Sequence, residues 1–387
     1  MQKWAKPFIL IGMFITAYLL ILAWQKDYGH LAGDAVPTPV AQTAQPASVD
    51  IPSTSAVTTA TPAPNSDVPP MPVVTTAAVP AVVAPTPPST QGLITVQTDM
   101  YRLHIDPKGG DVVRAELLNH LHAADTKQPF VLLEQGPSRV YTAQSGLVGA
   151  DGPDAAATGR PMYKATQASY TLVKGQKTLD IPLTFDAPNG VQIVKNFHIT
   201  EGKYPVVVSY KIINRGTAPW HGQMFGQVKR DNSVDPSKAN QGMMGMATFM
   251  GGAWGTPEKL YNKLDFENFQ TEALNTTVKG GWVAVLQHYF VTAWVPDASY
   301  SAVLSSRVSG NDNFIGFTAP LMTVVPGTEQ NVSATLYVGP KVQENLKPLA
   351  TGLEQTVDYG WLWPIAQVLF IGLQYIHGFL GNWGWSI

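Results

Sequence analysis

Histidines are the side chains best suited to chemistry in this 387-residue sequence, which contains eight of them and no cysteine. His120 and His122 lie two residues apart in NHLHAAD, with Asp125 close behind. On a strand the two rings would share one face, as a metal site needs. No third ligand follows at a spacing typical of zinc sites, so a polar loop after a strand is the better interpretation and a metal site the alternative.

The carboxylates show no pattern that indicates catalysis. Glu134, Asp180 and Asp186 are scattered, and sequence alone does not pair them as acid and base. No nucleophile elbow, zinc-peptidase motif or Walker loop occurs, and the glycine pair at Gly109 predicts a turn. The lack of cysteine excludes a thiol nucleophile and zinc–thiolate centres. We therefore assign no catalytic, cofactor-binding or metal-binding residue, and we expect no cofactor and no enzyme.

Two unusual segments could either bind a ligand or partner or pack in the hydrophobic core. Residues 240–261, NQGMMGMATFMGGAWGTPEKLY, form a loop whose methionines could line an adaptable surface or fill core gaps, and we prefer the second. Residues 280–296, GGWVAVLQHYFVTAWVP, predict a buried strand or a helix entering a strand. His288 in this segment is expected to be a satisfied core histidine rather than a catalyst.

The elements that must position these side chains are strands. Asn189-Gly190 stands between apolar runs and predicts a hairpin. Alternating runs around Lys174-Gly175, at 204–214, at 301–308 and at 333–340 continue the pattern. We predict an all-β fold, a large antiparallel sandwich over residues 92–350. One domain is expected rather than two, because no second linker interrupts it.

The first 27 residues predict a transmembrane anchor. Nineteen uncharged residues separate Lys6 from Lys26 and would span about 28 Å as a helix. A cleaved signal peptide is the alternative. Lys3 and Lys6 precede the span, whereas Lys26 and Asp27 cancel, so the amino terminus should be cytoplasmic. Residues 28–91 hold thirteen prolines and few charges, which predicts a disordered tether.

The last 31 residues, 357–387, carry one charged residue, Asp358, and four tryptophans. From Pro364, the apolar positions Ile365, Leu369 and Leu373 follow helical spacing, which predicts an apolar helix with a narrow polar stripe. Such a helix could span a bilayer or lie in its interface, and the residues leave both open.

Four stretches carry a resemblance to a known family: GGWVAVLQHYFVTAWVP at 280–296, YVGPK at 337–341, VDYGWLWPIAQVLF at 357–370 and IHGFLGNWGWSI at 376–387. They resemble the YidC membrane-protein insertases of Gram-negative bacteria, as does the order of anchor, tether, β domain and Trp-rich segment. The resemblance implies a periplasmic β-supersandwich similar to galactose mutarotase. It also implies insertion and folding of inner-membrane proteins, alone or with the Sec translocon, without nucleotide or metal.

The resemblance implies several partners: nascent inner-membrane proteins, the Sec translocon with its accessory subunits, and the lipid bilayer. Nucleic acid is not expected, because the net charge is −2. In the family a bundle of five transmembrane helices encloses a hydrophilic groove with an arginine, and GNWGWSI leads into it. This sequence ends at Ile387, so we expect residues 351–387 to form an interfacial helix and a lead-in, without the groove helices.

Two other classes of function remain open: a membrane-tethered carbohydrate-binding or mutarotase-like domain, and an envelope scaffold that only binds partners. An open pocket with convergent His and Glu would favour the enzyme. A filled one would favour the other classes.

The orientation of the chain in the inner membrane can be tested with fusions at Gly92. We expect an alkaline phosphatase fusion to be active and a fluorescent-protein fusion to be dark, because the charge asymmetry places everything after Asp27 in the periplasm. Cytoplasmic fluorescence without phosphatase activity would contradict this orientation.

Overall fold

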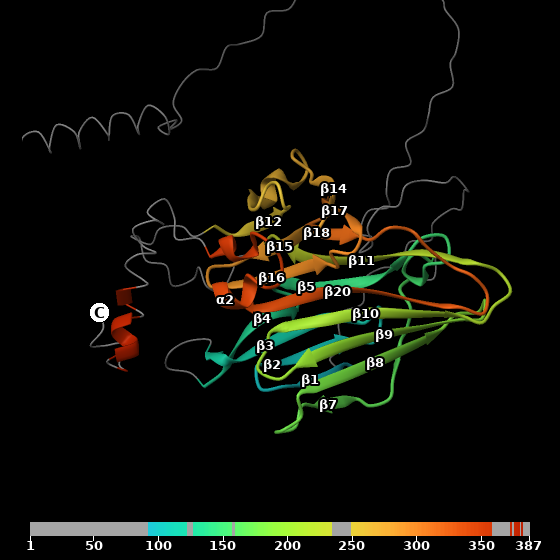
Figure 1. Ribbon diagram of the computed structural model, residues 1–387, viewed down its shortest axis with the longest axis horizontal. Coiled ribbons are helices and arrows are strands. Elements are labelled where there is room, and N and C mark those ends of the chain that lie inside the picture. Colours follow the sequence, from blue (N-terminus) through green and yellow to red (C-terminus); the bar gives the residue numbers. More distant parts are fainter. Residues whose placement is uncertain are drawn as a thin grey trace, which may run out of the picture. The chain divides into compact units, whose positions relative to one another are not determined.

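The computed structural model describes residues 92–121, 127–156, 159–233, 249–357, 372–373, 375–379 and 381. The described strands run from Ile94 to Pro340 and form two sheets (Figure 1). The predicted anchor and tether lie outside the described residues. Among those residues, no helix combines the length and the apolar character that crossing a membrane requires.

The first sheet contains eleven strands. In spatial order they are β14 (Asn275–Lys279), β17 (Ser301–Ser309), β18 (Asp312–Thr318), β11 (Trp220–Asp231), β5 (Val140–Val148), β4 (Pro129–Gln135), β3 (Asp111–Leu121), β2 (Tyr101–Asp106), β1 (Ile94–Gln97) and β7 (Ser169–Thr171), with β19 (Met322–Val324) paired to β11. The strand pairs are antiparallel except β1 with β7.

The second sheet contains nine strands. In spatial order they are β13 (Asn262–Leu264), β12 (Gly251–Gly255), β15 (Trp282–Leu286), β16 (Phe290–Pro296), β20 (Glu329–Pro340), β10 (Pro205–Asn214), β9 (Val191–Thr200), β8 (Thr178–Asp186) and β6 (Lys164–Ala165). Short helical turns are η1 (Pro153–Ala155), η3 (Phe266–Phe269), α2 (Gln343–Leu346) and η4 (Leu353–Thr356). Together the two sheets confirm the predicted antiparallel sandwich.

The Asn189-Gly190 turn joins β8 to β9 as predicted. Asp186 pairs with Gln192 across it, and Gly190 has φ +81°, a value that glycine adopts without strain. The Lys174-Gly175 turn has a different role. It joins β7, which pairs with β1 in the first sheet, to β8 in the second sheet, so this turn moves the chain between sheets.

The sheets pack face to face over a core of aromatic and branched side chains. The Trp294 ring of β16 lies 6.1 Å from the Phe317 ring of β18, and its indole N–H donates to the Gln227 carbonyl of β11 at 3.1 Å. Gly226 makes this approach possible, because a Cβ there would stand 2.5 Å from Phe317 and 2.9 Å from Trp294. The packing of the core therefore depends on glycine at position 226 as well as on the large side chains around it.

The outermost strands of both sheets are short. β6 has two residues, β7 and β13 have three each, and β14 has five. By comparison, the interior strands β11 and β20 have twelve residues each. These short strands cover only part of their neighbours: β6 pairs with Leu183 and Thr184 of the nine-residue β8 (Thr178–Asp186), so the rest of β8 forms the border of the second sheet itself.

Enlarging Gly226 should destabilise the domain. We expect Gly226→Val to lower the free energy of unfolding by roughly 1–3 kcal/mol, because the added atoms must displace Trp294 or Phe317. Urea denaturation followed by tryptophan fluorescence measures the change. The control is Gly136→Ala, where the nearest atom to a Cβ is 3.8 Å away and we expect a change within about 0.5 kcal/mol. Equal stabilities for the two variants would contradict the packing argument.

Candidate functional site

His120, the first of the paired histidines, lies at the end of β3. Its ring meets the edge of Phe290 at 5.4 Å, and burial lowers its pKa. His122 and Asp125 lie outside the described residues. Within the part of the chain that the structure describes, no cluster of three or more His, Asp or Glu side chains could hold a metal ion.

The three carboxylates singled out from the sequence have separate partners. Glu134 forms ion pairs with Arg114 at 3.4 Å and Arg139 at 3.3 Å. Asp180 accepts from Asn196 and is bonded to His198 on the outer face of the second sheet, and these hydrogen bonds lower its pKa against the opposing effect of partial burial. Asp186 accepts from Gln192. The structure therefore does not bring these three groups together as an acid–base pair.

The prediction that His288 is a core histidine is wrong. Residues 280–296 form the hairpin of β15 and β16, and His288 lies half-buried in its turn, with its ring 4.0 Å from that of Tyr289. The strand prediction for this segment is confirmed, since every residue of β15 and β16 is buried. The apolar run concealed the turn because the turn residues themselves include aromatic side chains.

The methionine-rich segment is partly a strand, not a loop throughout. Gly251–Gly255 form β12, which pairs with β15. Gly252 gives room to a neighbouring ring, because a Cβ there would stand 2.7 Å from Phe269. Residues 234–248, with most of the methionines, lie outside the described residues.

Four charged side chains, which we call the buried ionic cluster, lie between the sheets: Asp111, Asp154, Arg160 and Lys195. Arg160 forms ion pairs with Asp111 and, at 2.8 Å, with Asp154. Lys195, fully buried on β9, donates to the carbonyl oxygens of Gly109 at 3.0 Å and Ser145 at 3.1 Å. The cluster thus places two basic side chains beside two carboxylates, so that each buried polar group has a partner.

Burial determines the protonation of this cluster. Desolvation lowers the pKa of Lys195 to about 7, and nearby Arg160 acts in the same direction while Asp111 opposes it. Arg160 keeps its charge because its two carboxylate partners raise its pKa against desolvation. Burial also raises the pKa of Tyr210, whose hydroxyl lies 3.2 Å from that of Ser145. The groups are closely packed and mutually satisfied, which indicates a structural role.

Sequence reasoning missed the cluster, although β9 carries a signal for it. In this strand Ile193, Lys195 and Phe197 occupy alternate positions, and the two apolar neighbours face the core. A lysine in phase with core residues must either reach solvent or find buried partners. The carboxylate partners come from β3 and η1, which sequence alone does not bring near β9.

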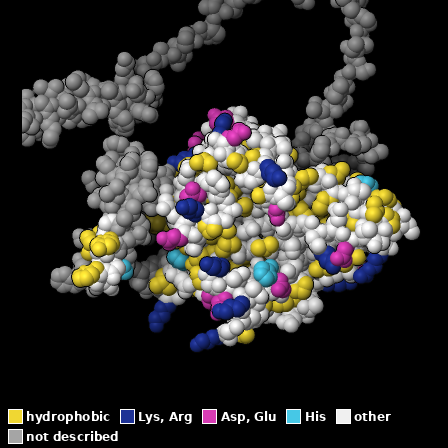
Figure 2. Space-filling model, in the orientation of Figure 1, with side chains coloured by type: hydrophobic (Ala, Val, Ile, Leu, Met, Phe, Trp, Pro, Cys, Tyr) yellow, Lys and Arg dark blue, Asp and Glu magenta, His cyan; other side chains and the backbone are white. Residues whose placement is uncertain are grey.

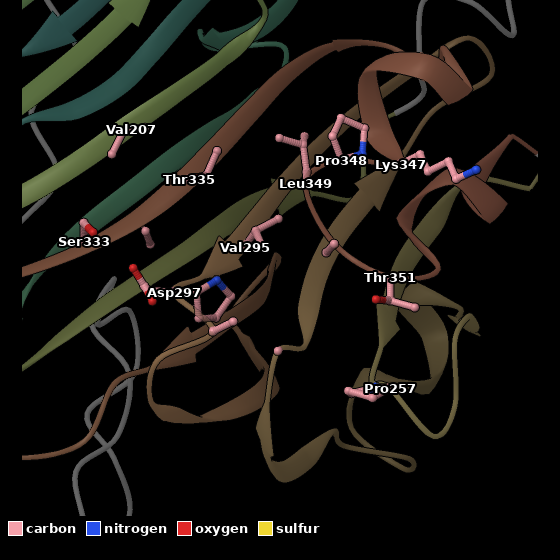
Figure 3. A pocket seen from close by; sticks show the side chains of 15 residues that line it. Val207, Pro257, Val295, Asp297, Ser333, Thr335, Lys347, Pro348, Leu349 and Thr351 are labelled. Carbon is pink, nitrogen blue, oxygen red and sulfur yellow. The ribbon is translucent and has the colours of Figure 1, made fainter.

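A groove of about 580 Å³ on the outer face of the second sheet is the candidate binding site (Figure 3). Val207, Thr335 and Val295 form a row across its floor, because they are register partners on β10, β20 and β16. One wall of the groove is the segment 347–351, which follows α2. An adjoining hollow of about 430 Å³ shares Asp297 and Ser333 with it.

The groove is mixed in chemistry. Prolines, valines and alanines alternate with the alcohols of Ser333, Thr335 and Thr351. Asp297 and Lys347 are its two charged side chains among the described residues, and Figure 3 shows them far apart. On the face of the domain that Figure 2 shows, acidic, basic and apolar side chains are interspersed. Such a lining suits an extended polar and apolar ligand and offers no convergent His and Glu for acid–base chemistry.

Lys195 should make stability depend on pH. Its folded pKa is lowered below the ordinary 10.5, so above about pH 7 the unfolded chain holds a proton that the folded chain loses. Stability should therefore rise from pH 7 to pH 9, by about 2 kcal/mol. Lys195→Met should remove this rise, as measured by urea denaturation at each pH.

The control for this experiment is Lys211→Met on the outer face of β10, where Lys211 forms an exposed ion pair with Glu329 at 2.8 Å. This variant should keep the rise of the unmodified chain. A rise of the same size in Lys195→Met would show that another group causes it.

Curated protein sequences are similar to this chain along almost its whole length. The membrane protein insertase YidC of Pseudomonas syringae pv. syringae (strain B728a) is 43% identical over 395 residues, which cover 99% of this chain. That of Stutzerimonas stutzeri (strain A1501) is 43% identical over 384 residues, again 99% of this chain. The chain spans 66% of the length of each relative, just under two thirds.

Solved structures give a more distant likeness. A galactose mutarotase related enzyme from Lactobacillus acidophilus has a TM-score of 0.42 at 10% identity, covering 64% of this chain and 97% of that one. A galactose mutarotase-like protein from Lactobacillus casei ATCC 334 has a TM-score of 0.36 at 9% identity, covering 64% of this chain and 100% of that one.

The family model for the YidC periplasmic domain matches residues 93–371, a range that contains both sheets, the buried ionic cluster and the groove. This match covers well over half of the chain. The chain therefore belongs to the YidC periplasmic domain family.

Proposed function

We propose that this chain is the anchor and periplasmic portion of a membrane protein insertase. One observation carries the proposal: the similarity to named insertases extends over 99% of the chain and does not stop at the β domain. Residues 1–27 would form the anchor, 28–91 the tether, 92–350 the periplasmic domain, and 351–387 an interfacial helix with its lead-in. The partners would be nascent inner-membrane proteins, the bilayer and the Sec translocon.

The described part of the carboxyl-terminal segment is consistent with an interfacial helix. Residues 375–379 are helical, and Tyr375, Ile376 and Phe379 are exposed by 83%, 43% and 89%. Positions i, i+1 and i+4 lie on one side of a helix, so an apolar face is available to a bilayer surface.

Within the periplasmic domain, we propose that the groove contacts extended client segments. Its floor is a strand surface where apolar and hydroxyl side chains alternate, and its opposite wall is a segment without regular strand structure. An extended chain presents both apolar side chains and backbone polar groups, and this lining can accept both. The carbohydrate-acting alternative finds no support in the groove, for want of converging His and Glu.

A chimera tests the proposed function. Residues 1–387 are joined to the part of the Pseudomonas syringae insertase that the similarity leaves unmatched, and the chimera is expressed in insertase-depleted cells. We expect growth and insertion of a small phage coat protein to be restored, because the two proteins share their arrangement along the whole matched length.

The control is the same chimera with residues 1–27 replaced by a cleavable signal peptide, which should export the domain without its anchor and lower coat-protein insertion. A chimera that is made and membrane-bound but restores neither growth nor insertion would overturn the proposed function.

A further inference from the structure

Three exposed apolar side chains come from the same end of the β domain, where β3 ends and β15 turns into β16. Leu121, Tyr289 and Val342 are exposed by 52%, 65% and 36%. They come from three separate chain segments: the end of β3, the β15–β16 turn and the approach to α2. We call these three residues the apolar rim.

Contacts between neighbouring residues connect the three segments that carry the rim. The ring of His120, next to Leu121, meets that of Phe290, next to Tyr289, at 5.4 Å. The backbone N–H of Lys341, next to Val342, donates to the Tyr289 carbonyl at 2.8 Å. The three rim residues are therefore immediate chain neighbours of groups in direct contact.

The rim is held by ordered strand ends. Phe290 stacks on Phe130 with ring centroids 4.3 Å apart and pairs with Pro340 across β16 and β20. The Phe290–Phe130 stacking and the β16–β20 pairing do not involve the rim side chains, which stay exposed. A rigid support beneath exposed apolar side chains presents them to a partner without an ordering cost at contact.

The chain path relates the rim to the bilayer, and this step rests on the proposed function. α2 follows Val342 directly, and η4, which ends at Thr356, packs against α2. Residues 358–371 then connect to the helical residues with the exposed apolar face. These fourteen residues reach about 50 Å when fully extended, so a membrane-bound helix keeps this part of the domain near the membrane.

The chemistry of the rim fits lipid better than protein. Tyrosine is enriched at membrane interfaces, and aliphatic side chains at its sides can enter the headgroup boundary. Lys127 lies in the segment between β3 and β4, Lys341 is next to Val342 in the chain, and Glu344 is the nearby acidic residue in sequence. An excess of basic residues at this end suits anionic headgroups. A second copy of the chain is a poorer fit, because three side chains bury far less than the roughly 1,000 Å² of a stable interface.

We propose that the apolar rim of Leu121, Tyr289 and Val342 rests in the headgroup region of the bilayer, so that the β domain touches the membrane with its own surface. This contact is separate from the anchor and from the interfacial helix. It would set the orientation of the domain above the membrane.

Site-specific fluorescence tests the contact, since the cysteine-free chain allows single labels. Leu121→Cys, Tyr289→Cys and Val342→Cys are labelled with NBD in the full chain, reconstituted into phosphatidylethanolamine–phosphatidylglycerol vesicles. Nitroxide lipids labelled near the headgroup should cause a roughly twofold or greater loss of NBD emission at these sites. The matched controls are Val173→Cys and Leu321→Cys, exposed by 58% and 59% on other loops, and should show little loss.

Equal quenching at all five sites, or quenching at none, would overturn the proposal. Shielding of the rim labels in detergent without lipid, growing with protein concentration, would point to a second copy and would also overturn it. Circular dichroism melting confirms that each labelled variant is folded. The chimera experiment does not depend on these labels, so the two proposals fail separately.

Discussion

The hydrogen bonds of Lys195 to two carbonyls across the interior are the interaction on which the arrangement of this domain depends. The amine comes from β9 in the second sheet, whereas Ser145 lies on β5 of the first sheet and Gly109 in the turn between β2 and β3. Apolar contacts between sheets tolerate sliding, but a buried amine does not, because a shifted register would leave its N–H groups without acceptors. Arg160 and its two carboxylates extend the same constraint to the loop that contains η1.

Once the sheets are fixed in this way, their outer faces become available for contacts. The segment after β20 covers part of the second sheet, with Leu346 and Leu353 fully buried and the Trp282 indole donating to the Thr351 carbonyl at 3.1 Å. The groove is the seam that this covering segment leaves beside β10 and β20. The interior is thus filled and structural, while the groove is a surface that two separate parts of the chain build together.

Much of the fold was accessible from the sequence, and the site was not. Alternation along β10 and the Asn189-Gly190 turn report local geometry, which propensity and periodicity capture. The placement of β7 and β8 in different sheets depends on long-range pairing that no local pattern contains. The groove depends on register between β10, β20 and β16, and the ionic cluster on residues far apart in the chain. His288 was misjudged because burial of its strands was extended to their turn.

The short border strands matter most if the domain lies close to unfolded polypeptide chains. A protein that works beside chains still waiting to fold is surrounded by backbone amides and carbonyls in search of partners. A long open edge strand would form backbone hydrogen bonds with any such chain, whatever its sequence, and would bind it strongly. The three- and five-residue strands β7, β13 and β14 offer few hydrogen bonds for lasting capture. On β8, which β6 covers only at Leu183 and Thr184, Pro182 has no N–H to donate, so a strand added there would lack one ladder bond. Short borders and a proline thus both make the domain a poor seed for unfolded neighbours.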